Sequence, residues 1–401
     1  MSAAADTATE RRALPPWITP ARLIMAVYFA EAVIYGTWFP RIPDIQARLH
    51  LGPAQLAIAL LGSSTGGFIS STFAARIIER LTPRRTMMLG FAAYGLALQL
   101  PGWAWDTASL LVALFVMGVM YVFVDLSMNV EAARIQEVLG RRIMSRCHGF
   151  WSIGSICGLL IGAAFAGWRT DFRWQALIVA VLSAPCGVAI AWALPRLLPA
   201  ARKTAREFPI TLPTIAMIPL AIFAFGCLLT EITTRNWGAV YLRDALGALP
   251  FVGGLGLAEF TLFMAIGRLT GDRLADRFGP VALGRGAAAL AAIGLLLLLV
   301  APNLVVAAIG LAALGGGVSV GYPLTVTAAA ARTDRSPARN VASLSAVSYI
   351  ASVIGPPLVG FVAQGAGLRW GLATILPAAA LAAIFAGALQ RPRLAETAAP
   401  R

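Results

Sequence analysis

The chain has 401 residues, of which 59% are hydrophobic and only 12% are charged, and its formal net charge is +14. Soluble domains carry about 25% charged and about 45–50% apolar residues, so this composition excludes an ordinary soluble multidomain protein. A positive charge would indicate nucleic-acid binding only if the basic residues formed a patch or a stripe, so their distribution along the chain decides its meaning.

Long apolar runs bounded by Pro, Gly or charged residues predict about twelve membrane-spanning helices, because one span needs about 20 apolar residues. The first twenty residues are polar and lack the pattern of a signal peptide, which predicts a short cytoplasmic tail. The predicted spans are 22–40, 54–78, 86–104, 108–132, 147–168, 173–194, 213–236, 251–271, 281–301, 303–329, 341–365 and 371–390.

The longest polar stretch between spans, which carries the only lysine, Lys203, divides the chain into two halves of six spans. Three features recur at an offset of 197–199 residues. Trp38 corresponds to Trp237, Glu79 to Asp276, and Arg134 lies near the position of Arg332. Such matches indicate an internal duplication, as in transporters built from parallel repeats. The predicted parts are tail 1–21, bundle 22–195, linker 196–212, bundle 213–390 and tail 391–401.

An even number of spans places both termini on one side of the membrane, and the positive-inside rule identifies that side. Of the 32 Lys and Arg residues, 25 fall in the tails and in the loops on the side of the termini. The termini are therefore predicted to be cytoplasmic, and the net charge is an orientation signal rather than a nucleic-acid footprint. The basic residues assigned to the opposite side are Arg41, Arg48, Arg169, Arg173, Arg235, Arg243 and Arg369.

The segment 271–279, Gly-Asp-Arg-Leu-Ala-Asp-Arg-Phe-Gly, resembles the signature loop of the major facilitator superfamily, and 75–82 repeats it weakly. It departs from the family pattern at Asp272, where Gly is preferred, and at Pro280, where a basic residue is preferred. An acid near a helix N-terminus is favoured by the helix dipole, and neighbouring Arg residues can pair with it. The resemblance implies gating by Glu79, Arg80, Asp272, Asp276 and Arg277.

Three further segments, 36–45, 125–129 and 148–154, resemble the YbjJ-like bacterial inner-membrane transporters, a branch related to the fucose:proton symporters. The resemblance implies an all-α major facilitator fold of two pseudo-symmetric six-helix bundles in the inner membrane. Spans 1, 4, 7 and 10 would line a central cavity, and spans 2, 5, 8 and 11 would form the seam between halves. Acids in spans 1 and 4 would match the protonation and sugar-binding carboxyls of the symporters.

Ionisable residues inside spans are costly, at about 2.5–3.5 kcal/mol each, and are therefore functional candidates. Glu31 lies about nine residues, or ~14 Å, into the first span, near the middle of a ~30 Å core. Tyr28, Tyr35 and Trp38 share its helix face. A low-dielectric environment favours the protonated carboxyl, which suits proton coupling. The alternative is a neutral structural acid bonded to Tyr or to the backbone.

Asp125 lies in the fourth span, with Asn129 one turn further on. Folding spans 4 and 5 back on each other about residue 138 predicts that His148 and Trp151 approach Asp125 and Asn129. An Asp–His pair in a membrane is a candidate proton relay. The alternative is that His148 and Asn129 bond across the hairpin only to hold it together.

In the second half, Glu231 is expected near the outer end of the seventh span. It either bonds a polar substrate or pairs with Arg235 at the surface. Glu259 in the eighth span is a candidate second proton site or part of a gate. Pro323 is expected to break the tenth span. Neutral groups on spans 10 and 11 that can bond a substrate are Tyr322, Thr325 and Tyr349.

Gly154, Gly158 and Gly162 recur at four-residue spacing in the fifth span and permit close helix approach, which we expect where the two halves move against each other. The same span has no proline in 155–160, whereas drug:proton antiporters carry a proline-containing motif there. Export by that family's mechanism is thereby disfavoured.

We therefore predict a proton-coupled symporter that moves a small polar solute by alternating access; the alternative is a proton-driven exporter of drugs or other amphiphiles. No catalytic or metal constellation, disulfide framework or phosphate-binding loop is found, so we expect no enzyme activity and no cofactor. The expected partners are the solute, protons and lipid, with a monomeric chain and no nucleic acid. Proton coupling is assigned to Glu31, Asp125 and His148. Substrate binding is assigned to Tyr35, Trp38, Asn129, Trp151, Glu231, Tyr322, Thr325 and Tyr349.

Overall fold

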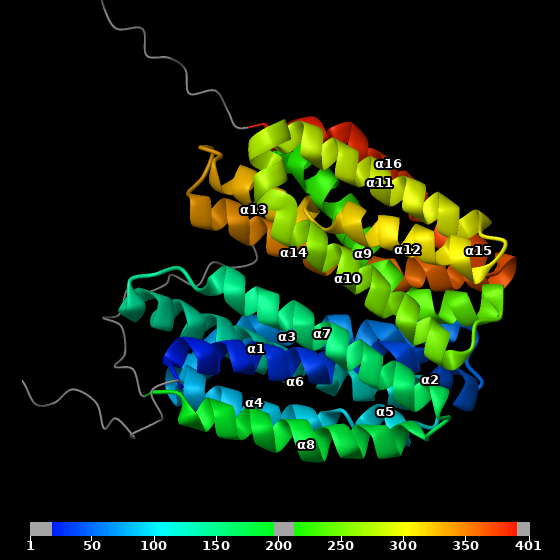
Figure 1. The fold of residues 1–401 in the computed structure, drawn as a ribbon, viewed down its shortest axis with the longest axis horizontal. Helices are drawn as coiled ribbons and strands as arrows, with labels where there is room; N and C mark the ends of the chain where they lie inside the picture. Colours follow the sequence, from blue (N-terminus) through cyan, green and yellow to red (C-terminus); the bar gives the residue numbers. More distant parts are fainter. Residues whose placement is uncertain (1–17, 196–211, 391–401) are drawn as a thin grey trace, which may run out of the picture. The chain divides into compact units, whose positions relative to one another are not determined.

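The computed structural model describes residues 18–195 and 212–390, and every regular element in those ranges is a helix (Figure 1). Residues 1–17, 196–211 and 391–401 lie outside the description, so most of the predicted tails and linker is not described. Eleven helical segments in the described ranges are long and apolar enough to cross a membrane. The described residues form two compact units, one of residues 18–51 and 58–195 and one of residues 52–57 and 212–390.

The helices of the first half follow the predicted spans closely. They are α1 (Pro20–Gly36), η1 (Phe39–Arg41), α2 (Ile42–Arg48), α3 (Pro53–Leu81), α4 (Pro83–Ala97), α5 (Leu100–Trp103), α6 (Thr107–Leu139), α7 (Met144–Gly167) and α8 (Phe172–Ala193). The predicted span 86–104 is divided between α4 and α5, and it is the one predicted span that is not among the eleven candidate segments in the described ranges.

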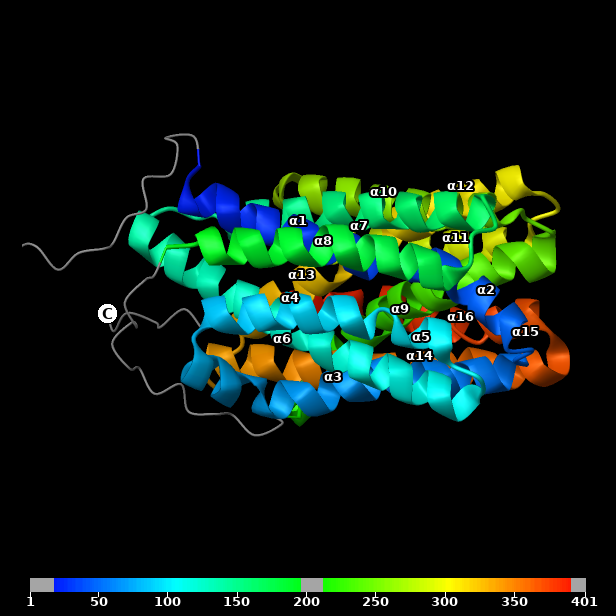
Figure 2. The ribbon, with the colours of Figure 1, turned by 90° about the horizontal axis from the view of Figure 1, so that it is seen from below.

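The second half repeats this order. Its helices are η2 (Ile215–Met217), α9 (Ile218–Leu246), α10 (Pro250–Phe278), α11 (Pro280–Val300), α12 (Leu304–Val318), α13 (Gly321–Ala330), α14 (Pro337–Ala366), α15 (Leu368–Ala373), α16 (Leu376–Phe385) and η3 (Ala386–Leu389). Within this unit α10 and α12 pack along each other (Figure 2). Both α9 and α10 extend well beyond the predicted spans 213–236 and 251–271, so Glu231 lies near the middle of α9 and not near the outer end of its span, as was expected.

Prolines account for the breaks in four spans. A proline ring clashes with the carbonyl four residues earlier and cannot donate to it. Helices α1, α4 and α15 end at Gly36, Ala97 and Ala373, which lie four residues before Pro40, Pro101 and Pro377. Helix α12 ends just before Ser319, four residues before Pro323, so the predicted break in the tenth span is confirmed. Pro185, Pro356 and Pro357, by contrast, lie inside continuous helices.

The internal duplication extends to the backbone conformation. Thr82, between α3 and α4, has φ 78° and ψ 148°, and Gly279, between α10 and α11, has φ 79° and ψ 154°. The two residues are 197 positions apart, within the offset range of the repeated sequence features. Only glycine adopts this region readily, so the first copy, which lacks the glycine, holds a strained threonine in the same turn.

Helix α1 packs along α7 and also contacts α6 and α8 in the first unit. Glycines on α7 make the approach of α1 and α7 close: a Cβ on Gly154 or Gly158 would lie less than 3.0 Å from Phe29 O or Val33 O. Gly162 similarly faces Thr37 O at 2.6 Å. The close helix approach that this spacing predicts is therefore found within the first unit, with α1 and with the turn that follows it.

The second unit has a buried apolar core around α9. The side chains come from α9 and its leading turn, α11, α13, α14, α16 and η3 and leave little room for a solute at this end of the unit. They are Met217, Leu220, Phe223, Cys227, Ala288, Ala328, Ala329, Leu344, Ala382, Ala386 and Leu389.

Candidate functional site

The centre of the first unit holds a fully buried carboxyl, Glu31 of α1, with a relative exposure of 0%. The indole Nε1 of Trp151 on α7 donates a hydrogen bond of 2.7 Å to Glu31 Oε2. The other oxygen, Oε1, is buried without a hydrogen-bond partner among the described residues. Buried polar atoms are normally bonded, so a carboxyl with one satisfied oxygen and one unsatisfied oxygen is suited to binding a proton or a polar ligand.

Aromatic rings surround this carboxyl. The ring centroid of Tyr35 lies 5.0 Å from that of Tyr121 on α6, 5.7 Å from that of Trp151 and 4.9 Å from that of Phe39. Tyr94 of α4 stands edge-on to Tyr121 at 6.1 Å. Rings at these distances make favourable offset or edge contacts and exclude water from the acid. Sequence reasoning placed Tyr35 and Trp151 in the site but missed Tyr121, although Tyr121 lies one helical turn before Asp125.

Asp125 and Asn129 are joined to this cluster through Tyr28. Asn129 Nδ2 donates to the Asp125 carbonyl at 2.8 Å and to its Oδ1 at 3.3 Å. The Tyr28 hydroxyl donates to Asn129 Oδ1 at 2.8 Å, and the Tyr28 ring stands edge-on to His148 at 5.4 Å. Asn129 therefore links the Asp125 carboxyl on α6 to Tyr28 on α1, and the His148 imidazole packs against the same tyrosine.

The prediction that His148 and Trp151 approach Asp125 and Asn129 across a hairpin did not include α1. Asn129 is joined to Tyr28 of α1, and Trp151 bonds Glu31 of the same helix. The physical reason is that α1 packs against both α6 and α7, so side chains from those helices meet it. His148 contacts the same group through the ring of Tyr28.

Trp38 lies outside this cluster. It follows the end of α1, so the helical spacing that placed it on the face of Glu31 no longer applies. Its ring packs edge-on against Phe172 of α8, with centroids 5.7 Å apart, and the residue is only 4% exposed. This is a packing position between η1 and α8.

Next to Trp38, Arg41 is buried at 2% exposure, although its position in sequence indicated a loop. Its Nε donates to Asp44 Oδ2 at 2.5 Å, its Nη1 to Gln175 Oε1 at 2.5 Å and its Nη2 to Thr170 O at 2.6 Å. Gln175 Nε2 in turn donates to Thr37 O at 3.0 Å. This network fastens the broken end of α1 to α8 and to the turn before it, so it fixes the position of the helix that carries Glu31.

A second charged group lies in the second unit. Glu231 Oε1 accepts from Arg235 Nη2 at 2.9 Å on the same helix, and both Glu231 oxygens accept from Arg268 Nη2 of α10 at 3.3 Å. The count of basic residues had assigned Arg235 to the outer side and Arg268 to the side of the termini, although both lie within the predicted spans 213–236 and 251–271. In the structure both lie inside helices and share one carboxyl.

The remaining candidates of the second unit are more dispersed. Glu259 is half-buried on α10 and lies nine residues before Arg268, on the opposite side of that helix. Thr325 is fully buried, and its hydroxyl donates to Gly321 O at 2.7 Å. Tyr322 packs against the apolar core, and Tyr349 is half-buried on α14.

The gating candidates lie at helix ends. Asp272, Asp276 and Arg277 are placed in the last two turns of α10, where the helix dipole favours the basic residue rather than the acids. The expectation that the acids stand near a helix N-terminus thus does not hold for α10. Arg277 lies over the Phe278 ring, with its guanidinium carbon 5.2 Å from the centroid. Glu79 and Arg80 are exposed at the equivalent end of α3.

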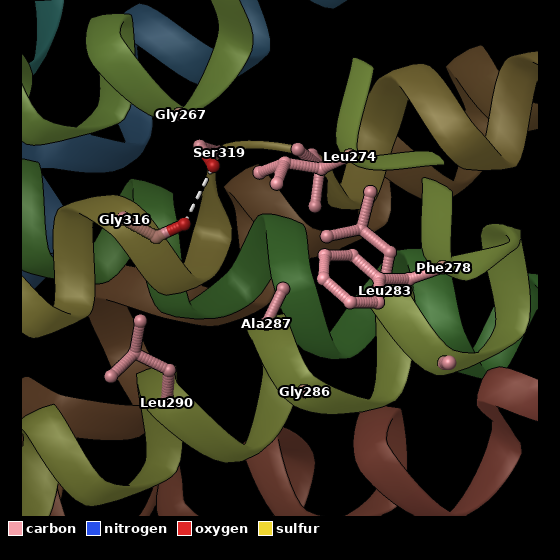
Figure 3. Close-up of a pocket in the computed structure, with 11 residues that line it drawn as sticks. Gly267, Leu274, Phe278, Leu283, Gly286, Ala287, Leu290, Gly316 and Ser319 are labelled. Carbon is pink, nitrogen blue, oxygen red and sulfur yellow. Dashed lines mark hydrogen bonds between the residues drawn. The ribbon is translucent and has the colours of Figure 1, made fainter. Parts of the chain in front are cut away.

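A cavity opens beside each of these two helix ends. In the first unit a cavity of about 470 Å³ is lined by Glu79, Arg84, Arg85, Glu131 and Arg134 together with apolar residues. In the second unit a cavity of about 360 Å³ is lined almost entirely by apolar residues of α10, α11 and α12 (Figure 3). Its hydroxyl, Ser319 Oγ, already donates to Gly316 O at 2.6 Å. Neither cavity contains Glu31 or Glu231, so neither is the site of the buried acids.

In the part of the chain that the structure describes, no group of three or more His, Cys, Asp or Glu side chains is placed to hold a metal ion. The four cysteines are unpaired with one another. The chemistry available in the two units is therefore that of buried carboxyls, tyrosines, an imidazole and guanidinium groups.

Comparison with known proteins agrees with this architecture. The model of the Major Facilitator Superfamily matches residues 24–237 and 220–401. The "uncharacterized transporter y4wD" of Sinorhizobium fredii is 28% identical over 394 residues, covering 95% of this chain and 100% of the relative. A mutant of the nucleoside transporter NupG is similar in structure, with a TM-score of 0.74 at 12% identity over 92% of this chain and 99% of the other. A variant of the Escherichia coli fucose:proton symporter FucP gives 0.60 at 18% identity, over 94% and 100%.

Proposed function

Because the chain belongs to the major facilitator superfamily and is a multi-pass membrane transporter, we propose that it moves a small polar solute by alternating access and couples this movement to protons. The single observation that supports proton coupling best is the state of Glu31. Its carboxyl is fully buried, one oxygen accepts the Trp151 indole, and the other has no partner among the described residues. An acid in this environment binds and releases a proton when its surroundings change between conformations.

Asp125 is the proposed second acid of this coupling. It is connected to the Glu31 helix through Asn129 and Tyr28, and His148 lies against the same tyrosine. Tyrosine, amide and imidazole groups that lie next to one another in space can pass a proton or bond the hydroxyl groups of a solute. Among the structural relatives, a nucleoside transporter and a fucose:proton symporter are named for polar solutes, which supports a polar cargo for this chain.

A second candidate function, export of amphiphilic compounds, is favoured by the rings around Glu31. Tyr35, Tyr121, Trp151 and Tyr94 would suit the apolar part of such a cargo. The two functions differ in the expected selectivity. A site that bonds the hydroxyl groups of its solute strongly rejects analogues that lack them, whereas an apolar pocket discriminates weakly between analogues.

The test uses the full chain in proteoliposomes that enclose a pH-sensitive dye. Sugars, polyols, nucleosides, organic acids and lipophilic dyes are added one at a time, and solute-dependent proton movement is recorded. We expect a polar solute to move protons with the wild type, and Glu31→Gln and Asp125→Asn to lose the proton movement. Glu137→Gln, an exposed acid at the end of α6, serves as the control.

Unchanged solute-dependent proton movement in both buried-acid variants would refute proton coupling through these residues. Proton movement with lipophilic dyes alone, and with little discrimination among them, would favour the exporter. Both outcomes are readable because each substitution conserves side-chain shape, and the amide introduced by Glu31→Gln still has a carbonyl oxygen that can accept from the Trp151 indole.

We also propose that the protein resides in the bacterial inner membrane with both termini in the cytoplasm and that it acts as a monomer. The excess of basic residues on the side of the termini supports this orientation. Asp272, Asp276 and Arg277, with Glu79 and Arg80 of the first repeat, are proposed to gate the cytoplasmic side. Fusions of a periplasm-dependent phosphatase to the C-terminus and after Leu246 test the orientation, with activity expected only after Leu246.

A further inference from the structure

The charged group of the second unit contains more positive than negative side chains. Glu231 carries one carboxylate, and both Arg235 and Arg268 bond to it. The side chains of Glu231 and Arg235 are 15% and 9% exposed, and that of Arg268 is 32% exposed. All three lie within apolar helices. Glu231 is ~20 Å along α9, and Arg268 is ~15 Å from the end of α10, at 1.5 Å per residue.

The two arginines are held unequally. Arg235 Nη2 lies 2.9 Å from the carboxylate, a normal distance for a charge-assisted hydrogen bond. Arg268 Nη2 lies 3.3 Å from both oxygens, which is longer than such bonds usually are. Within the described residues, Nη2 is the only atom of Arg268 that bonds to the protein, and a guanidinium has five N–H donors in a planar fork. Arg268 therefore keeps most of its donors for another acceptor.

Two other acids of α10 do not fill that role. Glu259 lies nine residues, or two and a half turns, before Arg268 and therefore projects from the opposite side of the helix. Asp272, one turn after Arg268, is exposed, and the ion pair described for Arg268 is with Glu231. A second cation held by one carboxylate inside a membrane is unfavourable unless an anion joins it. A guanidinium matches the two oxygens of a carboxylate or phosphate better than any other side chain.

We propose that Arg268, with Arg235 beside it, binds the carboxylate or phosphate group of the transported solute, and that Glu231 occupies this position on Arg268 while the solute is absent. The solute is then an organic anion with polar groups, such as a sugar acid or a sugar phosphate. This inference rests on the proposed transport of a polar solute, and it adds the charge of that solute. The placement of the group within α9 and α10, away from their ends, favours a solute over a lipid headgroup.

The experiment measures binding at equilibrium, without a pH gradient. The full chain is placed in phosphatidylcholine nanodiscs at pH 7, and thermal unfolding is followed by tryptophan fluorescence. Matched probes are glucose with gluconate and glucose 6-phosphate, glycerol with glycerate and glycerol 3-phosphate, and ribose with ribose 5-phosphate, all at equal ionic strength. We expect at least one anionic probe to stabilise the protein saturably, with an apparent Kd at least tenfold below that of its neutral partner.

Substitutions of Arg268 and of Glu231 are expected to change binding of the anionic probe in opposite directions. Arg268→Gln should weaken binding of the anionic probe at least tenfold, and Arg268→Lys, which keeps the charge but loses the fork, should weaken it less. Glu231→Gln should tighten binding of the same probe, because the competing carboxylate is removed. Arg285→Gln, an exposed arginine on α11, is the control and should leave binding unchanged. Weaker binding in both Glu231→Gln and Arg268→Gln would identify a purely structural ion pair and overturn the proposal.

Further outcomes overturn the proposal as well. They are equal stabilisation by neutral and anionic probes, stabilisation by none of the probes, and full binding by Arg268→Gln. Stabilisation that depends on Arg268 and on added phosphatidylglycerol, with no effect of the probes, would assign the site to a lipid headgroup. Because no gradient is applied, a negative result in this binding experiment does not bear on the proton-coupling test of Glu31 and Asp125. A negative result in the proton-coupling test likewise does not bear on the binding of the anionic probes.

Discussion

The indole Nε1 of Trp151 donates a hydrogen bond of 2.7 Å to Glu31 Oε2, and this bond joins α7 to α1 at the centre of the first unit. It is the one hydrogen bond that the Glu31 carboxyl makes within the described residues, because Oε1 has no partner there. Trp151 is thus a positioning residue for the acid, and its removal tests the coupling hypothesis without changing the acid itself.

Trp151→Phe should reduce proton-coupled uptake about 10- to 100-fold, because a buried carboxyl that loses its only hydrogen bond loses about 1–3 kcal/mol and the orientation that the bond provides. Initial uptake rates over a range of pH measure the effect, since a change in the pH profile would not follow from loss of folding alone. Trp105→Phe, at an exposed tryptophan before α6, is the control. Wild-type rates in Trp151→Phe together with inactive Glu31→Gln would refute the positioning role.

Gly158→Ala should destabilise the protein by about 1–3 kcal/mol, although alanine favours a helix, because the new methyl group would lie less than 3.0 Å from Val33 O. Gly149→Ala on the same helix is the matched control, since a Cβ there meets nothing within 4 Å. That variant should be neutral or more stable by up to about 1 kcal/mol. Thermal unfolding in detergent measures both, and equal stability of the two variants would contradict the close contact of α1 and α7.

Arg41→Gln should destabilise the first unit by about 1–3 kcal/mol, because it breaks a partly buried ion pair and leaves the buried Gln175 Oε1 and Thr170 O without their donors. The broken end of α1 would then be released from α8. Chemical denaturation of the purified protein gives the change in free energy, with Arg142→Gln, at an exposed arginine after α6, as the control. A change below about 1 kcal/mol would show that the network does not hold α1.

Gly279→Ala should lower stability by about 1–3 kcal/mol through backbone strain alone, because its φ is +79° and nothing lies within 4 Å of a Cβ there. Gly286→Ala on α11 also has open space but no positive φ, so it should not destabilise. The two variants therefore separate backbone strain from steric contact. Unfolding temperatures measured in parallel provide the comparison, and equal values would remove the argument that this turn requires glycine.

The pH dependence of folding should include a contribution from Asp106, the N-cap of α6. Two hydrogen bonds from Ser109 hold the pKa of the Asp106 carboxyl below its ordinary value. The larger contribution comes from the Ser109 hydroxyl, at 2.6 Å, and the smaller from its backbone amide, at 2.8 Å. A depressed pKa in the folded state means that the stabilisation is present above the unfolded value of about 3.9 and is lost as the pH falls through the folded value. The stability advantage of the wild type over Asp106→Asn should therefore shrink in acid. An advantage that grows as the pH falls would contradict the sign.

Much of the fold is readable from local sequence. Apolar runs of spanning length located the helices, since the thickness of a bilayer fixes how many residues a span needs. Pro323 marked the break between α12 and α13, because the missing donor and the clash of the ring act on the residue four positions earlier. The repeated features at one offset indicated the duplication that the backbone of Thr82 and Gly279 also displays.

The contacts between helices were not readable in the same way. Neighbouring spans 4 and 5 were expected to face each other, but the bonds of Asn129 and Trp151 to Tyr28 and Glu31 of α1 were not foreseen. Arg235 and Arg268 were counted on opposite sides of the membrane, yet they share Glu231 inside the helices. Hydropathy does not encode how far a helix continues past the apolar run or which way it is rotated.

The sequence by itself therefore determined that this protein is a membrane-embedded bundle of about twelve spans with a few acids inside them, because the cost of exposing polar groups to lipid acts residue by residue. Only the tertiary structure decided which of those acids are alone and which are paired. Glu31 keeps an unsatisfied oxygen, whereas Glu231 is shared by two arginines. The physical reason is that hydrogen bonds and ion pairs act over about 3 Å, so they depend on the rotation and order of helices that lie far apart in the chain.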